Sequence, residues 1–324
     1  MPAKLRPGDE VRVVSPAVSL GFIPEHQRTL AERRFEGLGL RCSFSRNAEV
    51  LDRFDSSPVE ARVSDLHEAF ADPGVRGIFT TLGGYNSNGL LDYLDYDLIA
   101  ENPKVFCGFS DITALASAIY ARTGLVTYSG PHFTTFGMKR GIEYTKECFE
   151  RCLMHEGPFE VPPADHWSDD PWYEDQETRD FVPNPGYEII HDGEAEGRLL
   201  GGNLGTLALL FGTSFMPDLN RTILLLEDDE EEGVVDFDRH LQSLIHQPGF
   251  AGVRGIVVGR FQRASEMDLD TLTAIVGSKR ELDSLPVVAN ASFGHTTPQF
   301  TFPIGGYGRL RADNGVAALH IDEH

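Results

Sequence analysis

The residue types that nucleophilic hydrolysis requires occur in this sequence at points where a chain can present them. Ser110 lies in KVFCGFSDITAL (residues 104–115), where an apolar strand pattern runs into Gly-Phe-Ser-Asp and then into a helix pattern. A serine at such a turn is exposed, and the N-terminus of the following helix favours negative charge developing beside it. The G-x-S-x-G pattern of hydrolases lacks its second glycine here, and a serine or aspartate that merely caps the helix would look the same. Ser110 is therefore a candidate nucleophile that still needs a base.

The best candidate for that base is His295, and the best candidate for its orienting carboxylate is Glu227. His295 follows the apolar run PVVANASFG and precedes Thr-Thr-Pro, so it lies at a strand end, where a purely structural histidine is an equal alternative. Glu227 is the first acid after the apolar run TILLL, whereas the acids at 228–232 fit a solvated face better. The chain order Ser110, Glu227, His295 permits a catalytic triad assembled across two domains.

Paired glycines, Gly83 and Gly84, follow another strand pattern in LGGYN. Glycines let backbone N–H groups approach a ligand closely, so an N–H of this turn and that of Asp111 could bind the oxyanion of a tetrahedral intermediate. Gly83 and Tyr85 are further candidates for substrate contact, and a tight turn with only a backbone role is the alternative. Neither this turn nor GGN at 201–203 matches a dinucleotide or P-loop pattern, and no H-E-x-x-H occurs, so we expect no cofactor and no metal.

The first half of the chain alternates short apolar runs with amphipathic stretches. The predicted strands are VRVVSPA, 40–45, 75–84, KVFCGFS and 125–130, and the predicted helices are 25–38, 57–72, 87–100, 111–122 and 143–154. This alternation predicts an α/β domain whose parallel sheet is covered by helices on both faces. Ligands of such sheets bind at the carboxyl ends of the strands, so Ser110 and the glycine turn should share that edge.

After residue 190 the apolar runs are mainly β-like. The predicted strands are 196–205, 221–228, 252–261, 285–295 and 315–321, and the predicted helices are 203–212, 234–246 and 268–282. We therefore expect a second, smaller α/β domain with a β-rich, barrel-like mixed sheet. The chain then divides into an N-terminal domain at 1–156 carrying the nucleophile, a linker and substrate loop at 157–190, and a C-terminal domain at 191–324 carrying the Glu and His.

Residues 157–190 differ from both halves because they are rich in Pro, Asp and aromatic residues. This stretch is too polar and too often broken by proline for a core element, and long loops of this kind are often functional. It contains Trp167 and Trp172, the only tryptophans of the chain. A linker rarely needs tryptophan, so the pattern favours a loop that contacts ligand.

Composition excludes several classes of protein. The formal net charge is −22 at pH 7, which argues against binding to a nucleic-acid backbone. The longest apolar runs, TILLL and GIVVG, are far too short to span a bilayer, and MPAKLRPGDEVRVVSPA lacks the apolar region of a signal peptide. Four cysteines without framework spacing fit a reducing compartment, so we expect a cytoplasmic protein with no membrane partner.

Seven motifs together resemble the LD-carboxypeptidase family of serine peptidases, and within it the branch of the microcin C immunity peptidase. They are LRPGDEVRVVSPA, GGYNSN, VFCGFSDITAL, GRLLGGNLGTLALL, TILLLED, FDRHLQSLIHQPGF and FGHTTPQFTFPIG. The resemblance implies a Rossmann-like N-terminal domain, a β-rich C-terminal domain, a homodimer and a metal-free Ser-Glu-His triad. By motif the triad is Ser110, Glu227 and His295, with backbone N–H groups of Asp111 and Gly84 as oxyanion donors.

The resemblance leaves two classes of substrate open. The immunity branch cleaves an aminoacyl or peptidyl group from a modified adenylate, with a loop tryptophan stacked on the adenine, and the 157–190 insertion favours this branch, with Trp167 preferred over Trp172. The other members remove the terminal D-alanine of murein tetrapeptides. The basic residue that immunity enzymes place after the catalytic Glu is replaced here by DDEEE, which puts a preference for aspartyl substrates in doubt. A non-catalytic protein that binds nucleotides or peptides on the same scaffold is the alternative from another class.

Overall fold

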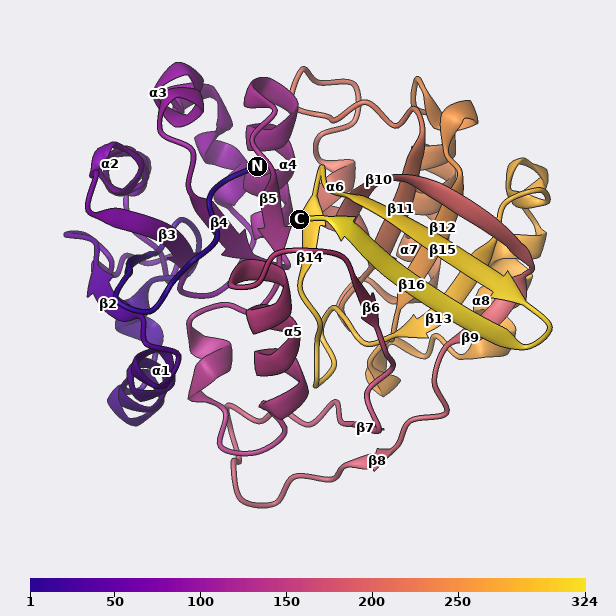
Figure 1. The fold of residues 1–324 in the computed structure, drawn as a ribbon, viewed down its shortest axis with the longest axis horizontal. Coiled ribbons are helices and arrows are strands. Elements are labelled where there is room, and N and C mark those ends of the chain that lie inside the picture. The colour runs from indigo at the N-terminus through magenta and orange to yellow at the C-terminus, as the bar shows by residue number, and fades with distance from the viewer.

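The computed structural model describes residues 1–324 and contains two large sheets joined side by side (Figure 1). The first sheet has the strand order β14-β5-β4-β3-β1-β2, in which every neighbouring pair is parallel except β14 with β5. Its strands are β1 (Glu10–Val14), β2 (Arg41–Phe44), β3 (Val75–Thr80), β4 (Val105–Gly108), β5 (Thr127–Ser129) and β14 (Phe302–Ile304).

Helices cover both faces of this first sheet. Ile78 and Phe79 are neighbours on β3, yet they pack into two different hydrophobic clusters because successive strand residues point to opposite faces. Phe79 packs with Phe35 of α1 and Phe149 of α5, whereas Ile78 belongs to the cluster that includes Phe70 of α2. The helices are α1 (Glu25–Gly37), α2 (Val59–Ala71), α3 (Tyr96–Glu101), α4 (Ile112–Thr123) and α5 (Glu143–Leu153), with short 3-10 helices η1 (Leu20–Phe22), η2 (Ser87–Tyr93) and η3 (Thr134–Gly137).

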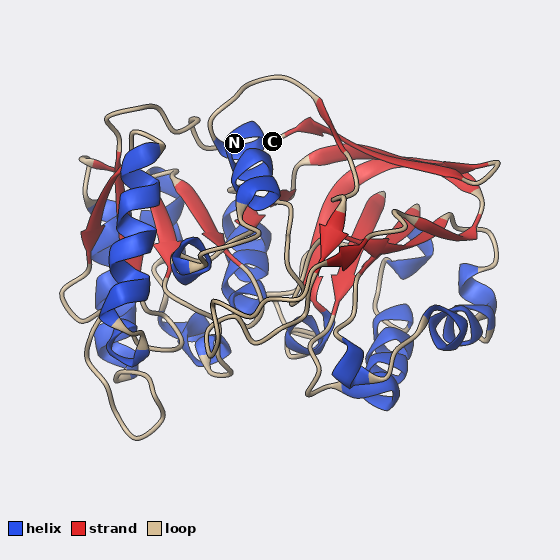
Figure 2. Ribbon diagram, turned by 90° about the horizontal axis from the view of Figure 1, so that it is seen from below, coloured by secondary structure: helices blue, strands red, loops and turns tan.

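The second sheet is mixed and has the strand order β6-β16-β15-β10-β11-β12-β13-β9. Strands β10 to β13 are parallel, and the remaining neighbours are antiparallel. Figure 2 shows the helices of this half gathered on one side of its sheet. The strands are β6 (Phe159–Val161), β9 (Glu188–His191), β10 (Gly193–Asn203), β11 (Thr222–Glu227), β12 (Gly255–Gly259), β13 (Val287–Ala291), β15 (Tyr307–Asp313) and β16 (Val316–Glu323). The helices are α6 (Leu204–Ala208), α7 (Gly233–Ile245) and α8 (Leu269–Gly277), with 3-10 helices η4 (Phe250–Gly252), η5 (Arg263–Ser265) and η6 (Arg280–Leu282).

The predicted fold class, a parallel α/β half followed by a β-rich half, is confirmed. The sequence missed β15, because YGRLRAD alternates buried residues with exposed arginines and has little apolar content. It also missed β6, β9 and β14, which are three or four residues long and gain their stability from the sheets they join. The predicted helix at 87–100 is in fact η2 followed by α3.

Strand β14 carries the C-terminal part of the chain back into the first sheet. Its residues pair with β5, with Phe302 opposite Ser129 and Ile304 opposite Thr127. Residues 292–301 therefore cross from the end of β13 to the first sheet, and they bring His295 beside the end of β4. This crossing is what joins the predicted catalytic residues in space.

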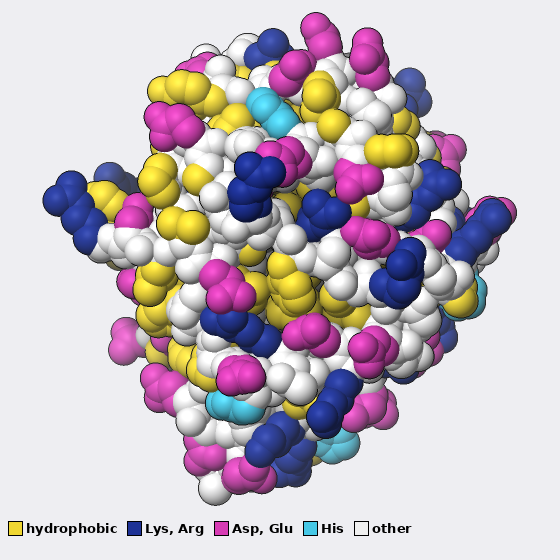
Figure 3. All heavy atoms as spheres, turned by 90° about the vertical axis from the view of Figure 1, so that its left-hand side faces the viewer, with side chains coloured by type: hydrophobic (Ala, Val, Ile, Leu, Met, Phe, Trp, Pro, Cys, Tyr) yellow, Lys and Arg dark blue, Asp and Glu magenta, His cyan; other side chains and the backbone are white.

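None of the helices has the length and apolar character that crossing a membrane requires. Figure 3 shows that the face formed by the first-sheet half carries acidic and basic side chains interspersed, with hydrophobic side chains between them. No extended basic stripe lies on this face.

Candidate active site

Ser110 lies in the turn between β4 and α4, in a strained backbone conformation. Its φ of 58° is in the left-handed region, which residues with a Cβ adopt rarely and mainly where the surroundings enforce it. A side chain at Gly108 would place its Cβ 2.3 Å from the Thr80 hydroxyl oxygen, so the first glycine of the motif is required. The second glycine of the hydrolase pattern is absent because that position, Ile112, already belongs to α4 and packs in the core.

Ser110, His295 and Glu227 form a continuous chain of hydrogen bonds. His295 Nε2 lies 3.0 Å from Ser110 Oγ, and His295 Nδ1 lies 2.7 Å from Glu227 Oε2. Glu227 ends β11 and its side chain is 2% exposed, whereas that of His295 is 19% exposed. A Cβ at Gly294 would lie 2.5 Å from Glu227 Oε2, so only glycine lets the loop bring His295 this close to Glu227. The structure therefore brings together all three predicted catalytic side chains.

The charge of Glu227 controls the protonation of His295. Burial by itself lowers the pKa of His295, but the adjacent Glu227 carboxylate, which also accepts its Nδ1 proton, raises the pKa to about 9. Asp229 adds to this effect, with its Oδ2 3.9 Å from His295 Nε2. The arrangement stabilises an imidazolium, which is the species that a general base forms when it takes a proton from serine.

The glycine turn lies against the nucleophile. A Cβ at Gly83 would fall 2.9 Å from the Ser110 Cβ, and Gly84 has a φ of 150°. The Asp111 carboxylate accepts the backbone N–H groups of Asn86 (3.1 Å) and Ser87 (2.9 Å), which fixes this turn to the start of α4. Burial raises the pKa of that carboxyl.

Two backbone donors beside the serine remain available to a ligand. The N–H groups of Gly84 and Asp111 donate no hydrogen bond to another protein group. Both are the predicted oxyanion donors. Tyr85, predicted to contact substrate, is 65% exposed and, like Ser110 and Gly84, is not one of the residues that form the cleft wall described next, so its contact with substrate stays a prediction.

A cleft opens beside His295, and residues of both halves and of the 157–190 segment form its wall. Trp172 and Tyr173 lie in this wall, whereas Trp167 does not. The Trp167 ring instead lies beneath two guanidinium groups, 4.7 Å from Arg260 and 4.6 Å from Arg263. The preference for Trp167 over Trp172 as the ligand-facing tryptophan is therefore not supported by their positions. The wall consists of Leu82, Phe109, His132, Thr134, Thr135, Met138, Trp172, Tyr173, Asp229, Glu230, Glu231, Gln262, Gly294, His295, Thr296, Thr297 and Gln299.

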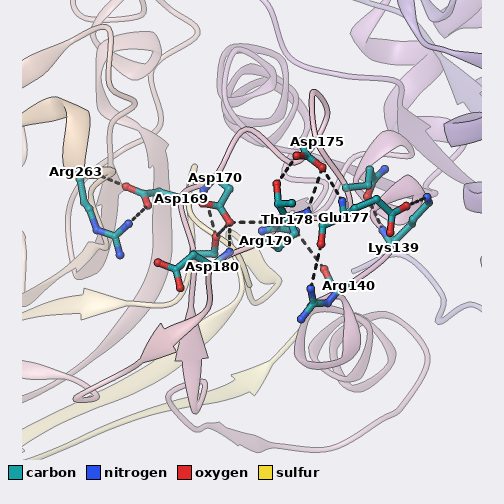
Figure 4. Close-up of polar contacts among 12 residues, drawn as sticks. Lys139, Arg140, Asp169, Asp170, Asp175, Glu177, Thr178, Arg179, Asp180 and Arg263 are labelled. Atoms are coloured by element: carbon teal, nitrogen blue, oxygen red, sulfur yellow. Dashed lines mark hydrogen bonds and ion pairs between the residues drawn. The ribbon is translucent and has the colours of Figure 1, made fainter.

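Polar contacts fix the 157–190 segment to both halves of the molecule (Figure 4). Asp169 pairs with Arg263 of the second half at 2.7 Å, and Glu177 pairs with Lys139 of the first half. Within the segment, the Asp170 carboxylate accepts the backbone N–H of Asp180 at 2.7 Å. The cleft wall is thus held in place from two sides.

Sequence reasoning missed His132, a fully buried histidine in the cleft wall. Its Nδ1 lies 2.8 Å from Thr80 Oγ1, and its ring stacks on Phe109 with centroids 4.3 Å apart. Its Nε2 has no hydrogen-bond partner. Its position in YSGPH, directly after a predicted strand, could have indicated this role. The carboxyl ends of parallel strands meet at one edge of the sheet, so His132 would have been expected near Ser110.

Asp228, Glu232 and His240 are the residues with the geometry to hold a metal ion. Their ligand atoms lie within 4.8 Å of one another. None of the three lies in the cleft wall. Burial, followed by the neighbouring Glu227 charge, raises the pKa of Asp228 to about 8, and its Oδ1 accepts the Gly205 N–H at 3.3 Å.

Comparison with known proteins places this site in a family. The chain matches an LD-carboxypeptidase N-terminal domain over residues 11–130 and an LD-carboxypeptidase C-terminal domain over residues 196–310. A Bacillus subtilis (strain 168) protein named "Putative carboxypeptidase YocD" is 52% identical over 322 residues, 99% of each chain. The crystal structure of an MccF-like protein from Bacillus anthracis str. Ames has a TM-score of 0.98 at 54% identity, covering 100% of this chain and 99% of that one.

A second solved structure carries a ligand. It is the microcin C7 self-immunity protein MccF in complex with aspartyl sulfamoyl adenosine, with a TM-score of 0.90 at 28% identity, covering 100% of this chain and 98% of that one. The two domain matches and the full-length relatives agree with the motifs of the sequence. The chain therefore belongs to the LD-carboxypeptidase family of serine peptidases.

Proposed function

We propose that this serine peptidase hydrolyses the bond between an aminoacyl or peptidyl group and a modified nucleotide, with Ser110 as nucleophile. The observation that carries the proposal is the chain of hydrogen bonds from Glu227 through His295 to Ser110, at 2.7 and 3.0 Å. These are the distances and the order of partners that nucleophile activation requires.

In the proposed mechanism, His295 takes the Ser110 proton through Nε2 as Oγ attacks the carbonyl carbon of the substrate. Glu227 accepts the Nδ1 proton in a hydrogen bond and stabilises the imidazolium that forms. The backbone N–H groups of Gly84 and Asp111 receive the oxyanion, with the N–H of Gly83 as the alternative to that of Gly84. His295 then protonates the leaving group, and water, activated by the same imidazole, releases the acyl group from Ser110.

The cleft wall supports a nucleotide as the leaving part of the substrate. Trp172 and Tyr173 offer aromatic faces, and stacking on a base contributes about 1–3 kcal/mol. MccF, which has the same fold, has been solved with aspartyl sulfamoyl adenosine bound. We therefore propose Trp172 as the residue that stacks on the base.

Two substrates and two variants test the proposal. Wild-type protein should release the amino acid from an aminoacyl sulfamoyl adenosine, and Ser110→Ala should lower this rate at least about 10³-fold while the circular dichroism spectrum is kept. Ser284→Ala, an exposed serine outside the cleft, is the matched control and should keep full activity. Cleavage of a murein tetrapeptide alone would support the carboxypeptidase alternative. Nucleotide binding without turnover, and without labelling of Ser110 by a fluorophosphonate, would support a binding protein.

The domain boundaries at 156 and 190, the homodimer and the cytoplasmic location remain predictions. Sedimentation velocity at micromolar concentration tests the homodimer directly, with a monomer as the contradicting result. Limited proteolysis tests the boundaries, because cleavage should concentrate in 157–190 if this segment links two domains.

A further inference from the structure

Apart from the catalytic His295, the charged residues of the cleft wall all carry one sign. Asp229, Glu230 and Glu231 contribute carboxylates, and no lysine or arginine lies in the wall. Arg260 and Arg263 stack on Trp167, outside the wall, and Arg263 also pairs with Asp169. Three carboxylates stand against the one imidazolium of His295, so a substrate that enters this cleft meets net negative charge.

The Glu230 carboxylate is held in position by Gln262, another residue of the cleft wall. The backbone N–H of Glu230 donates to Gln262 Oε1 at 3.1 Å, and Gln262 Nε2 donates to Glu230 Oε2 at 3.2 Å. Asp229 directly precedes Glu230 in the chain, and its Oδ2 lies 3.9 Å from His295 Nε2. The Asp229 carboxylate is therefore close to the catalytic imidazole.

His132 is a second and independent feature of the same wall. It is 1% exposed, and its Nε2 lacks a partner. Thr80 Oγ1 lies 2.8 Å from His132 Nδ1 and 3.4 Å from the Cys107 carbonyl oxygen, to which the hydroxyl can donate. In the neutral tautomer that donates through Nδ1 to Thr80, the buried Nε2 keeps a lone pair and is an acceptor without a partner. Its burial and the nearby His295 lower its pKa to about 3, which keeps it neutral.

An aromatic residue adds a third favourable feature for a cation. Trp172 is assigned to the base of the nucleotide, and the Tyr173 ring beside it in the wall attracts cations through its negative face. Carboxylates, an imidazole lone pair and an aromatic ring all favour a positively charged group and disfavour a carboxylate.

We propose that the acyl part of the substrate carries a side-chain ammonium or guanidinium group, as in lysyl, ornithyl or arginyl conjugates. This inference rests on the proposed function, because it names the side chain that the same cleft selects. It separates this chain from MccF, which has been solved in complex with an aspartyl and with a glutamyl conjugate.

The test compares kcat/KM for lysyl, norleucyl and aspartyl sulfamoyl adenosine with the full-length protein. Norleucine matches the length of lysine without its charge, so the ratio of lysyl to norleucyl isolates the ammonium group. We expect a ratio of about tenfold or more, with aspartyl the poorest substrate. The double variant Glu230→Gln/Glu231→Gln should bring the ratio close to one.

A control and three outcomes make the result decisive. Glu194→Gln/Glu196→Gln changes the charge equally on exposed positions of β10 outside the cleft, and it should keep the wild-type ratio. A wild-type ratio of one or less, or a ratio that the Glu230/Glu231 variant leaves unchanged, would overturn the inference. Hydrolysis of none of the three conjugates would instead overturn the proposed function itself.

Discussion

Replacement of Glu227 by glutamine should change both the rate and its pH dependence. The structure keeps the pKa of His295 at about 9, against an ordinary value of 6.5. This difference corresponds to roughly 3 kcal/mol in favour of the imidazolium, supplied mainly by Glu227 against the opposing effect of burial. Without the carboxylate, we expect the pKa to fall to about 6.5 or below, because burial then acts with only Asp228 and Asp229 to oppose it.

The rate should fall even though the base becomes easier to deprotonate. Loss of roughly 3 kcal/mol of imidazolium stabilisation lowers kcat by about 10²-fold. A glutamine that donates to Nδ1 would also fix the wrong tautomer of His295, with a loss in kcat of up to about 10⁴-fold.

The stability of the fold should change as well. A raised histidine pKa stabilises the fold below pH 6.5, and this contribution is lost as the pH rises through about 9. The variant should therefore lose most stability near pH 6.

Fluorophosphonate labelling of Ser110 measures the pH dependence without a substrate. Labelling rates between about pH 5 and pH 10 should rise toward about 9 in the wild type and level off near neutrality in Glu227→Gln, at a much lower plateau. Glu196→Gln, an exposed charge change on β10, should reproduce the wild-type profile. An identical pH midpoint in Glu227→Gln and the wild type would refute the assignment of Glu227 as the partner of His295.

Four further outcomes follow from the geometry. Gly84→Ala adds a Cβ about 3.1–3.2 Å from Val18 and Ala17 at a φ of 150°, so the oxyanion donor should shift and kcat should fall about 10²-fold at unchanged KM, measured by steady-state kinetics. Trp172→Ala should raise KM for the nucleotide conjugate about tenfold with a smaller effect on kcat, and an unchanged KM would exclude it as the stacking residue. Asp228→Asn should raise the melting temperature above pH 8 and leave it nearly unchanged at pH 4, because a buried carboxyl whose pKa is raised to about 8 costs stability once ionised. Dialysis against EDTA should leave hydrolysis unchanged, and a loss restored by zinc would implicate the Asp228 cluster.

The local placement of the catalytic residues could be predicted from the sequence. The pattern before Ser110 ends a strand and the pattern after it starts a helix, which fixes the turn whatever the rest of the chain does. Glu227 and His295 likewise follow apolar runs that predict strands. Because ligands of parallel sheets bind at the carboxyl ends of the strands, all three residues are predicted to lie at sheet edges where a ligand can bind. The alternation of strands and helices predicted the parallel sheet, because that pattern depends on local burial.

The partnership of those residues could not be predicted from patterning alone. The sequence equally permitted His295 to be a structural histidine, and only the resemblance to a family favoured the triad. The tryptophans show the same limit. Trp167 and Trp172 lie five residues apart in one polar loop, and nothing local distinguishes the one under two arginines from the one in the cleft wall.

What the sequence by itself determined is the set of elements and the edge at which each reactive side chain emerges, because both follow from local periodicity and turn chemistry. What only the tertiary structure decided is which edges meet. Strand β14 returns to the first sheet and pairs with β5, so the loop before it carries His295 across to Ser110 while Gly294 lets the same loop contact Glu227. Contacts between residues 185 positions apart, such as Ser110 and His295, depend on the packing of two sheets, and no local pattern encodes them.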